Sequence, residues 1–459
     1  EEMALLVNDM EKQVAKNEKQ TSGFPDEVKE KFIQARRALE QDRISESEEL
    51  CTKILQSFPC HPRCLHLRGV INLQKENISD SIFDLKNAIK MAPSPVAHFH
   101  ASLGYAYSTQ ADKSSSAIQE MRRAIELAPQ EIRYYEACAR FLKASKDFKA
   151  ACDLLEIAVS FDPTNSELHY KYAKYLRNKG DKDKAAEHFR KCLELQPDHS
   201  LAEFWLGTFG GSDAVPSKCP ENYIKKLYNG YASKFEEHLV KDLRYQTPTV
   251  INALLQQVTE ERGWNSTNNA ALDLGCGTGL SGLAFKVHAR SMVGVDLSEA
   301  MIEEARKKDI YNEVHVADVL GFLREKLIQS ENYNPPGEDG HSQPIHQFDL
   351  FIACDVFVYI GDLSEVMQTI SLLVKNTTLP RGDDSDQPSA IIVFSTEKQL
   401  SGDTPFTLND TGRYTHSKQY ILDICRQNDL EVCKIEERTI RQNKGLPVLG
   451  FLVVCSIVV

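Results

Sequence analysis

Three glycines in one short segment are the first residues of this chain whose spacing has chemical meaning. Gly275, Gly277 and Gly279 follow directly on an apolar run of strand length that ends Leu272-Asp273-Leu274. Glycine between a strand and a helix allows a tight turn and lets backbone amides come close to a bound molecule. The segment is therefore a candidate binding loop.

Two classes of ligand compete for this loop. Residues 277–282 match the glycine spacing of the dinucleotide fingerprint. That match begins too late, because the fingerprint should start directly after the strand, at Gly275, and its third glycine would then be Leu280. An acid inside the strand, Asp273, also suits a nicotinamide ligand poorly and suits a positively charged amino acid moiety better.

Two further acids stand where the next two expected strands end. Asp296 lies 21 positions after Gly275, where an acid can accept hydrogen bonds from both hydroxyls of a ribose. Asp318 closes the third strand, where an acid can bond an adenine amino group. Because ligands of open α/β sheets bind outside the carboxyl ends of the strands, three acids at three successive strand ends predict one nucleoside site.

These residues resemble class I S-adenosylmethionine-dependent methyltransferases over about residues 222–459. Segments 227–239, 243–248, 412–417 and 444–450 resemble a predicted family of tetratricopeptide-repeat-containing methyltransferases. The resemblance implies that S-adenosyl-L-methionine donates a methyl group to an unidentified acceptor. It also implies that Asp273, Gly275 and Gly277 meet the amino acid part of the donor, Asp296 the ribose and Asp318 the adenine. The full set of expected cofactor-binding residues is Tyr231, Asp273, Gly275, Cys276, Gly277, Gly279, Asp296, Leu297, Met301, Asp318, Val319 and Cys354.

The sequence marks the residues that would contact the methyl acceptor less clearly. The fourth expected strand leads into residues 354–360, which lack the Asn/Asp-Pro-Pro-Tyr loop that grips a planar amino group. A hydroxyl or ammonium acceptor needs a base to remove a proton. Candidate contacts to the acceptor are Tyr231 and Tyr414 together with three catalytic candidates, Asp355, Tyr359 and His416. Each has a structural alternative, for example Tyr359 as a packing aromatic residue and His416 as a helix cap or surface residue.

The elements that must position these residues alternate between strands and helices from about residue 220. We expect an α/β Rossmann-like domain with a seven-stranded, mostly parallel sheet whose last two strands form an antiparallel pair. The expected strands are residues 270–274, 291–295, 313–317, 348–353, 390–396, 431–438 and 448–456.

The N-terminal half carries a different pattern, a repeat of 34 residues. Ala117, Met121, Ala124 and Pro129 recur 34 positions later as Ala151, Leu155, Ala158 and Pro163, and the pattern extends to five units. A small, a large and a small residue at helical spacing mark one buried stripe, and the proline ends the helix. The pattern resembles tetratricopeptide repeats and predicts an α-helical solenoid. We expect a tail or frayed helix at 1–27, repeats with a capping helix at 28–211, and the methyltransferase domain at 222–459.

The repeats predict a protein or peptide partner bound in their groove. Bracing of the catalytic domain and self-association are the structural alternatives. Two other functions stay open, namely a non-enzymatic adaptor with a vestigial cofactor site and a small-molecule methyltransferase whose repeats are purely structural.

The composition of the chain limits which other classes of function are expected. The 54 basic and 66 acidic residues give a net charge of −12, which argues against sequence-independent nucleic-acid binding. The sequence contains no run of 18 apolar residues, so we expect no membrane span. Twelve dispersed cysteines indicate a reduced, cytoplasmic setting, although the first residue is Glu and a removed targeting segment stays open. Residues 60–66 hold two cysteines and two histidines without a second ligand pair, so no metal is expected.

Overall fold

The computed structural model describes residues 24–209, 215–237, 239, 244–265, 267, 269–331, 348–377, 387–400, 402–443 and 445–458. The chain divides into two compact units, Glu1–Asp198 and His199–Val459. Most of the expected tail, residues 1–23, lies outside the described residues. In the part of the chain that is described, no helix has the length and apolar character needed to cross a membrane.

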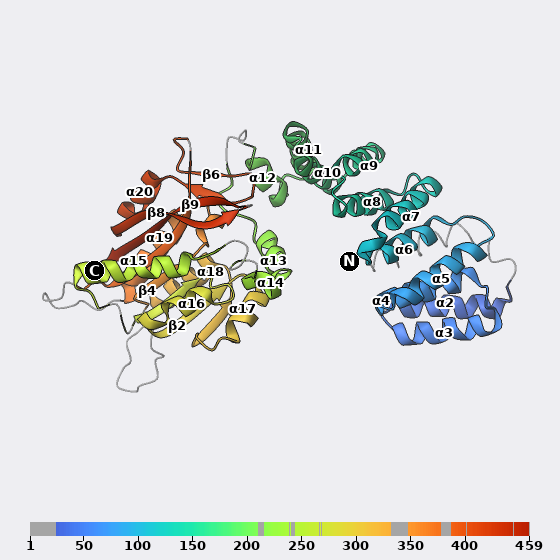
Figure 1. Cartoon of the computed structure of the whole chain (residues 1–459), viewed down its shortest axis with the longest axis horizontal. Coiled ribbons are helices and arrows are strands. Elements are labelled where there is room, and N and C mark those ends of the chain that lie inside the picture. The colour runs from blue at the N-terminus through green and yellow to red at the C-terminus, as the bar shows by residue number, and fades with distance from the viewer. Residues whose placement is uncertain are drawn as a thin grey trace. The chain divides into compact units, whose positions relative to one another are not determined.

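The first unit consists of helix pairs that follow one another along the chain (Figure 1). Five such pairs are described between residues 26 and 195. The pairs are α2 (Asp26–Glu40) with α3 (Ile44–Ser57), α4 (Pro62–Gln74) with α5 (Ile78–Met91), α6 (Ala97–Ser108) with α7 (Ser114–Leu127), α8 (Ile132–Ala144) with α9 (Phe148–Phe161), and α10 (Ser166–Lys179) with α11 (Lys182–Leu195).

The repeated columns of the sequence form the core of this unit. In every pair the second helix carries the small, large and small residues of the repeat, and these are at most 2% exposed. In α7 they are Ala117, Met121 and Ala124, which have no exposed surface. Gly104 of α6 faces this stripe, because a Cβ atom there would lie 3.1 Å from the carbonyl oxygen of Ala117. The small residues therefore let the paired helices approach closely, which confirms the interpretation of the 34-residue pattern.

Helix α12 (Ser200–Gly207), expected as the cap of the repeats, belongs to the second compact unit. Its Phe204 and Trp205 rings are buried and both contact Tyr223. Phe204 also contacts Tyr414, and Trp205 lies against Gly412. The helix thus packs on segments that are far away in the sequence and that carry candidate site residues.

The second unit is built on one sheet in which nine strands are described. The strand order is β3-β2-β1-β4-β5, after which β9 and then β8 add antiparallel strands. The first five strands are parallel, and all seven expected strands are present. The bounds are β1 Asn269–Leu274, β2 Ala289–Asp296, β3 Glu313–Val316, β4 Leu350–Ala353, β5 Ala390–Lys398, β6 Phe406–Leu408, β7 Tyr414–His416, β8 Glu431–Asn443 and β9 Leu446–Ile457.

Two of the nine strands were not expected, so the prediction of a seven-stranded sheet was two strands short. β6 and β7 form an antiparallel pair that adds to the end of β5 through Glu397 and Lys398. Each has only three residues, too few for an alternating pattern to be distinguished from a loop. Their place depends on β5, which lies elsewhere in the sequence.

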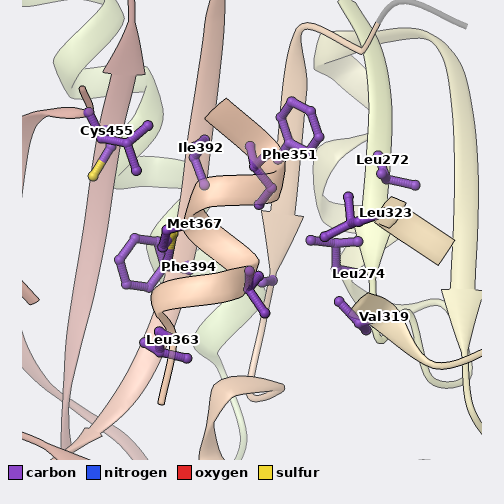
Figure 2. Packing of buried hydrophobic residues seen from close by; sticks show 14 of the residues in the cluster. Leu272, Leu274, Val319, Leu323, Phe351, Leu363, Met367, Ile392, Phe394 and Cys455 are labelled. Atoms are coloured by element: carbon purple, nitrogen blue, oxygen red, sulfur yellow. The ribbon is translucent and has the colours of Figure 1, made fainter. Parts of the chain in front are cut away.

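Helices cover both faces of the sheet. On one face, α18 (Val319–Glu331), α19 (Ser364–Thr377) and α20 (Lys418–Gln427) pack against the strands. Figure 2 shows Met367 of α19, Leu363 just before it, and Val319 and Leu323 of α18 over strand residues such as Phe351 and Phe394. On the other face lie α15 (Thr247–Arg262) and α16 (Leu280–Phe285). Three more helices, α13 (Glu221–Asn229), α14 (Ala232–Glu237) and α17 (Glu299–Arg306), border the carboxyl edge.

The repeat core yields a stability prediction. Leu155 of α9 is 1% exposed, whereas Ile157 of the same helix is 45% exposed. We expect Leu155→Ala to lower the free energy of unfolding by about 2–5 kcal/mol, because it leaves a cavity in the packed stripe. Chemical denaturation followed by far-ultraviolet circular dichroism measures this. The matched change Ile157→Ala should stay within about 0.5 kcal/mol of wild type, and equal effects of the two changes would contradict the assignment of the stripe.

Candidate active site

A cavity of about 800 Å³ lies at the carboxyl edge of the parallel strands. Residues that follow β1, β2, β3 and β4 line it from the sheet, and α13, α14 and the segment before α15 line it from the other side. It brings together most of the residues singled out from the sequence: Tyr231, Gly275, Cys276, Gly277, Asp296, Leu297, Met301, Asp318, Val319, Cys354, Asp355 and Tyr359.

The glycine loop after β1 has a backbone that favours glycine. Gly275, Gly277 and Gly279 have φ angles of 66°, 53° and 92°, in the left-handed region. At Gly275 a Cβ atom would also lie 2.3 Å from Cγ2 of Val356 in the loop after β4. The loop can therefore lie this close to the neighbouring loop only because no side chain is present.

Asp296 holds this loop from the end of β2. Its Oδ2 accepts the backbone N–H of Gly277 at 2.9 Å, and its Oδ1 accepts the N–H of Ser298 at 2.8 Å. Burial raises the pKa of Asp296, and these backbone hydrogen bonds oppose the shift. Each carboxylate oxygen has a second lone pair, so the carboxylate can take further donors from a ligand in the cavity.

Asp273 lies behind the loop rather than in the cavity wall. It is fully buried, and its Oδ2 accepts hydrogen bonds from Ser281 Oγ at 2.7 Å and from the Tyr311 hydroxyl at 2.6 Å. Its Oδ1 is buried without a hydrogen-bond partner. Burial raises the pKa of Asp273 to about 6. The side chain thus fixes the start of α16, and Gly279, also outside the cavity lining, marks the turn into that helix.

Asp318 lines the cavity at the end of β3 and caps α18. Its Oδ2 accepts the backbone N–H of Gly321 at 3.0 Å. The three acids therefore lie at three successive strand ends, as the sequence predicted, with two of them facing the cavity.

The wall opposite the sheet is tied down by polar contacts. Ser298 Oγ donates to Asn229 Oδ1 of α13 at 2.6 Å, and the hydroxyls of Tyr228 and Tyr359 share a hydrogen bond of 2.6 Å. Lys308 forms an ion pair with Glu236 of α14. These contacts hold α13 and α14 over the cavity, so bound molecules would be enclosed by protein.

Asp355 and Tyr359 lie together beyond the glycine loop. Asp355 has a φ of 57°, and its backbone N–H donates to Ser395 Oγ at 2.9 Å. A non-glycine residue in this region is uncommon, and aspartate is among the residues that adopt it most readily. Burial raises the pKa of Asp355, while Arg441 and Arg413 oppose the shift. The guanidinium of Arg413 lies over the Tyr359 ring at 5.4 Å.

Two candidate acceptor contacts lie outside the cavity lining. His416 is fully buried on β7, where Nε2 lies 3.0 Å from the carbonyl oxygens of both Ile360 and Gly361. Burial lowers the pKa of His416 to about 4. The Tyr414 hydroxyl donates to the Pro216 carbonyl at 2.6 Å. Both side chains therefore fasten β7 to neighbouring segments.

Several cavity residues were not identified from the sequence. They include Tyr228, Tyr245, Thr278, Arg413 and Arg441. Tyr228 and Arg413 lie in segments that the family resemblance covers, so they could have been found there. Arg441 had no local signal, because it is one of three cations in β8 and cations in a strand most often face solvent.

Comparison with known proteins agrees with this reading of both units. A family model described as a methyltransferase domain matches residues 272–379, and a tetratricopeptide repeat model matches residues 166–199. An uncharacterized methyltransferase of Schizosaccharomyces pombe is 25% identical over 162 residues, which make up 33% of this chain and 53% of that protein. A probable S-adenosylmethionine-dependent methyltransferase of Saccharomyces cerevisiae is 25% identical over 166 residues, 36% of this chain and 49% of that protein.

The chain thus spans about half the length of these curated relatives. Among solved structures, MamA is 20% identical, with a TM-score of 0.33, and the alignment covers 36% of this chain and 96% of MamA. The chain joins tetratricopeptide repeats to a methyltransferase domain.

The glycine loop yields a prediction with an internal control. Gly275 and Gly263 have φ angles of 66° and 68°, but only Gly275 has an atom within 4 Å of the Cβ position. We expect Gly263→Ala to cost about 1–2 kcal/mol of stability from backbone strain alone, and Gly275→Ala to cost a further 1–3 kcal/mol or so from the clash with Val356. Both tryptophans, Trp205 and Trp264, belong to the second unit, so denaturation followed by tryptophan fluorescence reports on it. Equal costs at the two positions would contradict the packing of the loop.

The buried Asp273 yields a pH prediction. Its pKa is raised from 3.8 to about 6 on folding, so the folded state holds the proton more tightly than the unfolded state. As pH rises from about 4 to about 6, this group lowers the free energy of unfolding, by on the order of 3 kcal/mol in total. Asp273→Asn should remove that loss, whereas Glu299→Gln, at an exposed position on α17, should keep the wild-type slope. An unchanged slope in Asp273→Asn would show that the carboxyl is not desolvated.

Proposed function

We propose that this chain, a methyltransferase domain joined to tetratricopeptide repeats, transfers a methyl group from S-adenosyl-L-methionine to an acceptor bound in the cavity. The observation that carries the proposal is the position of Asp296. Its carboxylate faces the cavity between the glycine loop and α17, with lone pairs left for ligand hydroxyls. This is where a ribose is bound in nucleoside-binding α/β sheets.

The rest of the cavity fits the same donor. Gly275 and Gly277 line the cavity with a left-handed backbone that favours glycine, and a Cβ atom at Gly275 would meet Val356. This backbone suits close approach of the amino acid part of the donor. Asp318 borders the far end of the cavity, and Met301, Leu297 and Val319 offer apolar surface for the faces of an adenine. A volume of about 800 Å³ lies toward the upper end of the 300–1,000 Å³ or so that a single drug-sized ligand occupies. There is room for a donor and a small acceptor.

When bound, S-adenosyl-L-methionine supplies an electrophilic methyl group on a positively charged sulfur. The chain's own contribution is to align the two molecules and to exclude water. The helices α13 and α14, fixed through Asn229, Tyr228 and Glu236, serve this enclosure. Asp355 lines the cavity, burial raises its pKa, and it is the group we assign to take the proton from a hydroxyl acceptor.

The repeats are assigned to recruiting a protein or peptide partner, the usual task of such solenoids. Four tyrosines on the first helices of the last two repeats are at most 6% exposed and therefore pack within the helix pairs rather than offering surface to a partner: Tyr134, Tyr135, Tyr170 and Tyr172. The adaptor alternative is less well supported, because a vestigial site has no reason to keep the hydrogen bonds of Asp296 and the left-handed glycine backbone of the loop.

Removal of the Asp296 carboxylate tests the proposal directly. We expect Asp296→Ala to weaken the binding of S-adenosyl-L-methionine by about 2–4 kcal/mol, roughly 30- to 700-fold, because charge-assisted hydrogen bonds are lost. Isothermal titration calorimetry measures the affinity. Glu299→Ala, at an exposed position three residues along the chain, should bind as wild type does.

Radiolabelled donor incubated with wild type and a cell extract should place label in an acceptor, and Asp296→Ala should place far less. Separation of the extract by size then shows whether the acceptor is a macromolecule or a small metabolite. The proposal fails if wild type does not bind the donor, or if Asp296→Ala binds it equally well.

A further inference from the structure

Two arginines line the part of the cavity beyond the glycine loop. Arg413 stands in the turn that leads into β7, and Arg441 stands near the end of β8. Arg441 is only 6% exposed. A buried guanidinium needs an explanation, because arginine is almost never fully buried unless it is paired.

The backbone of β8 is irregular where Arg441 occurs. Thr439 pairs with Leu449 and Arg441 pairs with Val448, so Ile440 is an extra residue that forms a β-bulge. The Thr247 hydroxyl at the start of α15 donates to the Ile440 carbonyl oxygen at 3.1 Å. Bulges beside active sites change the direction of the following side chain, and here the following side chain is Arg441, which lines the cavity.

Glu397 holds both arginines from outside the cavity. This β5 residue is 4% exposed, is not among the lining residues, and accepts from Nη1 of Arg413 at 3.4 Å and from Nη2 of Arg441. The two guanidinium groups are therefore fixed on one side and turned to the cavity on the other.

One donor of Arg441 is left without a hydrogen bond. Its Nη1 is buried and unpartnered, and the nearest carboxylate oxygen, Oδ2 of Asp355, is 3.8 Å away. The Oδ1 of Asp355 is already bonded to Ser395 Oγ at 3.3 Å. With Glu397 included, two guanidinium groups meet two carboxylates, so the charges of the cluster balance. What the cluster lacks is an acceptor for the buried Nη1 donor of Arg441, and a group bound in the cavity can supply one.

Tyrosines surround the arginines. Tyr228, Tyr245 and Tyr359 all line the cavity, and the rings of Tyr228 and Tyr359 meet edge to face. Such a wall suits a flat or apolar body. A planar guanidinium fork matches a carboxylate in shape and charge.

We infer that the methyl acceptor is a small organic acid whose carboxylate is bound by Arg441 and Arg413 beside the tyrosine wall. The role of this acid as methyl acceptor rests on the proposed function. The acid-binding site itself is inferred only from the contacts of the two arginines. Arg441 and Arg413 are positioning residues, since they orient the acid without touching the transferred methyl group.

Benzoate and benzamide test the inference as matched probes with the full chain. Calorimetric titration into protein saturated with S-adenosylhomocysteine should show benzoate binding at least tenfold more tightly than benzamide. Arg441→Gln should abolish this preference, and Arg441→Lys should keep part of it because the charge remains. Arg438→Gln on the same strand should bind as wild type does, because Arg438 is exposed and pairs with Glu436.

Three results would overturn the inference. One is equal affinity for benzoate and benzamide in wild type, which needs no variant to fold. Another is competition between S-adenosylhomocysteine and benzoate, because the arginines would then serve the carboxylate of the donor. The third is a protein that binds glycylglycine much more tightly than glycylglycine amide but does not bind benzoate. The arginines would then bind the C-terminal carboxylate of a peptide. Benzoate binding in a protein that does not bind S-adenosylhomocysteine would leave the acid site standing and refute only the proposed methyl donor.

Discussion

The carboxylate of Asp296 is the contact on which the candidate site depends. It joins the glycine loop after β1 to the start of α17 through the N–H groups of Gly277 and Ser298. The Ser298 hydroxyl then reaches Asn229 of α13. One side chain at the end of β2 therefore couples the sheet edge, the binding loop and the wall that encloses the cavity. A buried carboxylate is stable only with such donors, so the loop and the acid each explain the conformation of the other.

Features set by local pattern could be predicted from the sequence. The small and large columns of the 34-residue pattern mark side chains that are all buried, because a stripe at helical spacing has one way to pack. The strands and the cavity residues that follow their carboxyl ends could be predicted from apolar runs and from acids at strand ends. Features set by distant partners could not. The β6–β7 pair depends on β5, the bulge at Ile440 depends on β9, and the Tyr228–Tyr359 bond joins residues 131 positions apart. Asp273 was expected to meet the ligand, yet here its bonds are to Ser281 and Tyr311.

The two units bury their apolar side chains in different ways. In the repeats each helix pair buries its stripe on its neighbours, and small residues such as Ala151 and Ala158 let the backbones approach. In the second unit both faces of the sheet are covered, so the strands read as continuous apolar runs such as Ile391-Ile392-Val393-Phe394. Neither core requires the polar residues of the cavity. The binding residues come instead from strand ends, turns and loops, which a rigid sheet holds in place.

The buried charges beside the cavity complete this argument. Breaking a buried ion pair is costly, but replacing the whole pair by apolar residues is often neutral or stabilising. The Arg413–Glu397–Arg441 cluster with Asp355 therefore has little value as a stabilising device. The conformation of the cluster also costs free energy, since it needs a bulge at Ile440, a left-handed backbone at Asp355 and an unpartnered donor on Arg441. Strain and unpaired polar groups that gather at one cavity are accounted for when a ligand supplies the missing partner. The cluster lies next to the glycine loop but off it, so the partner it calls for is the second molecule of the cavity rather than the first.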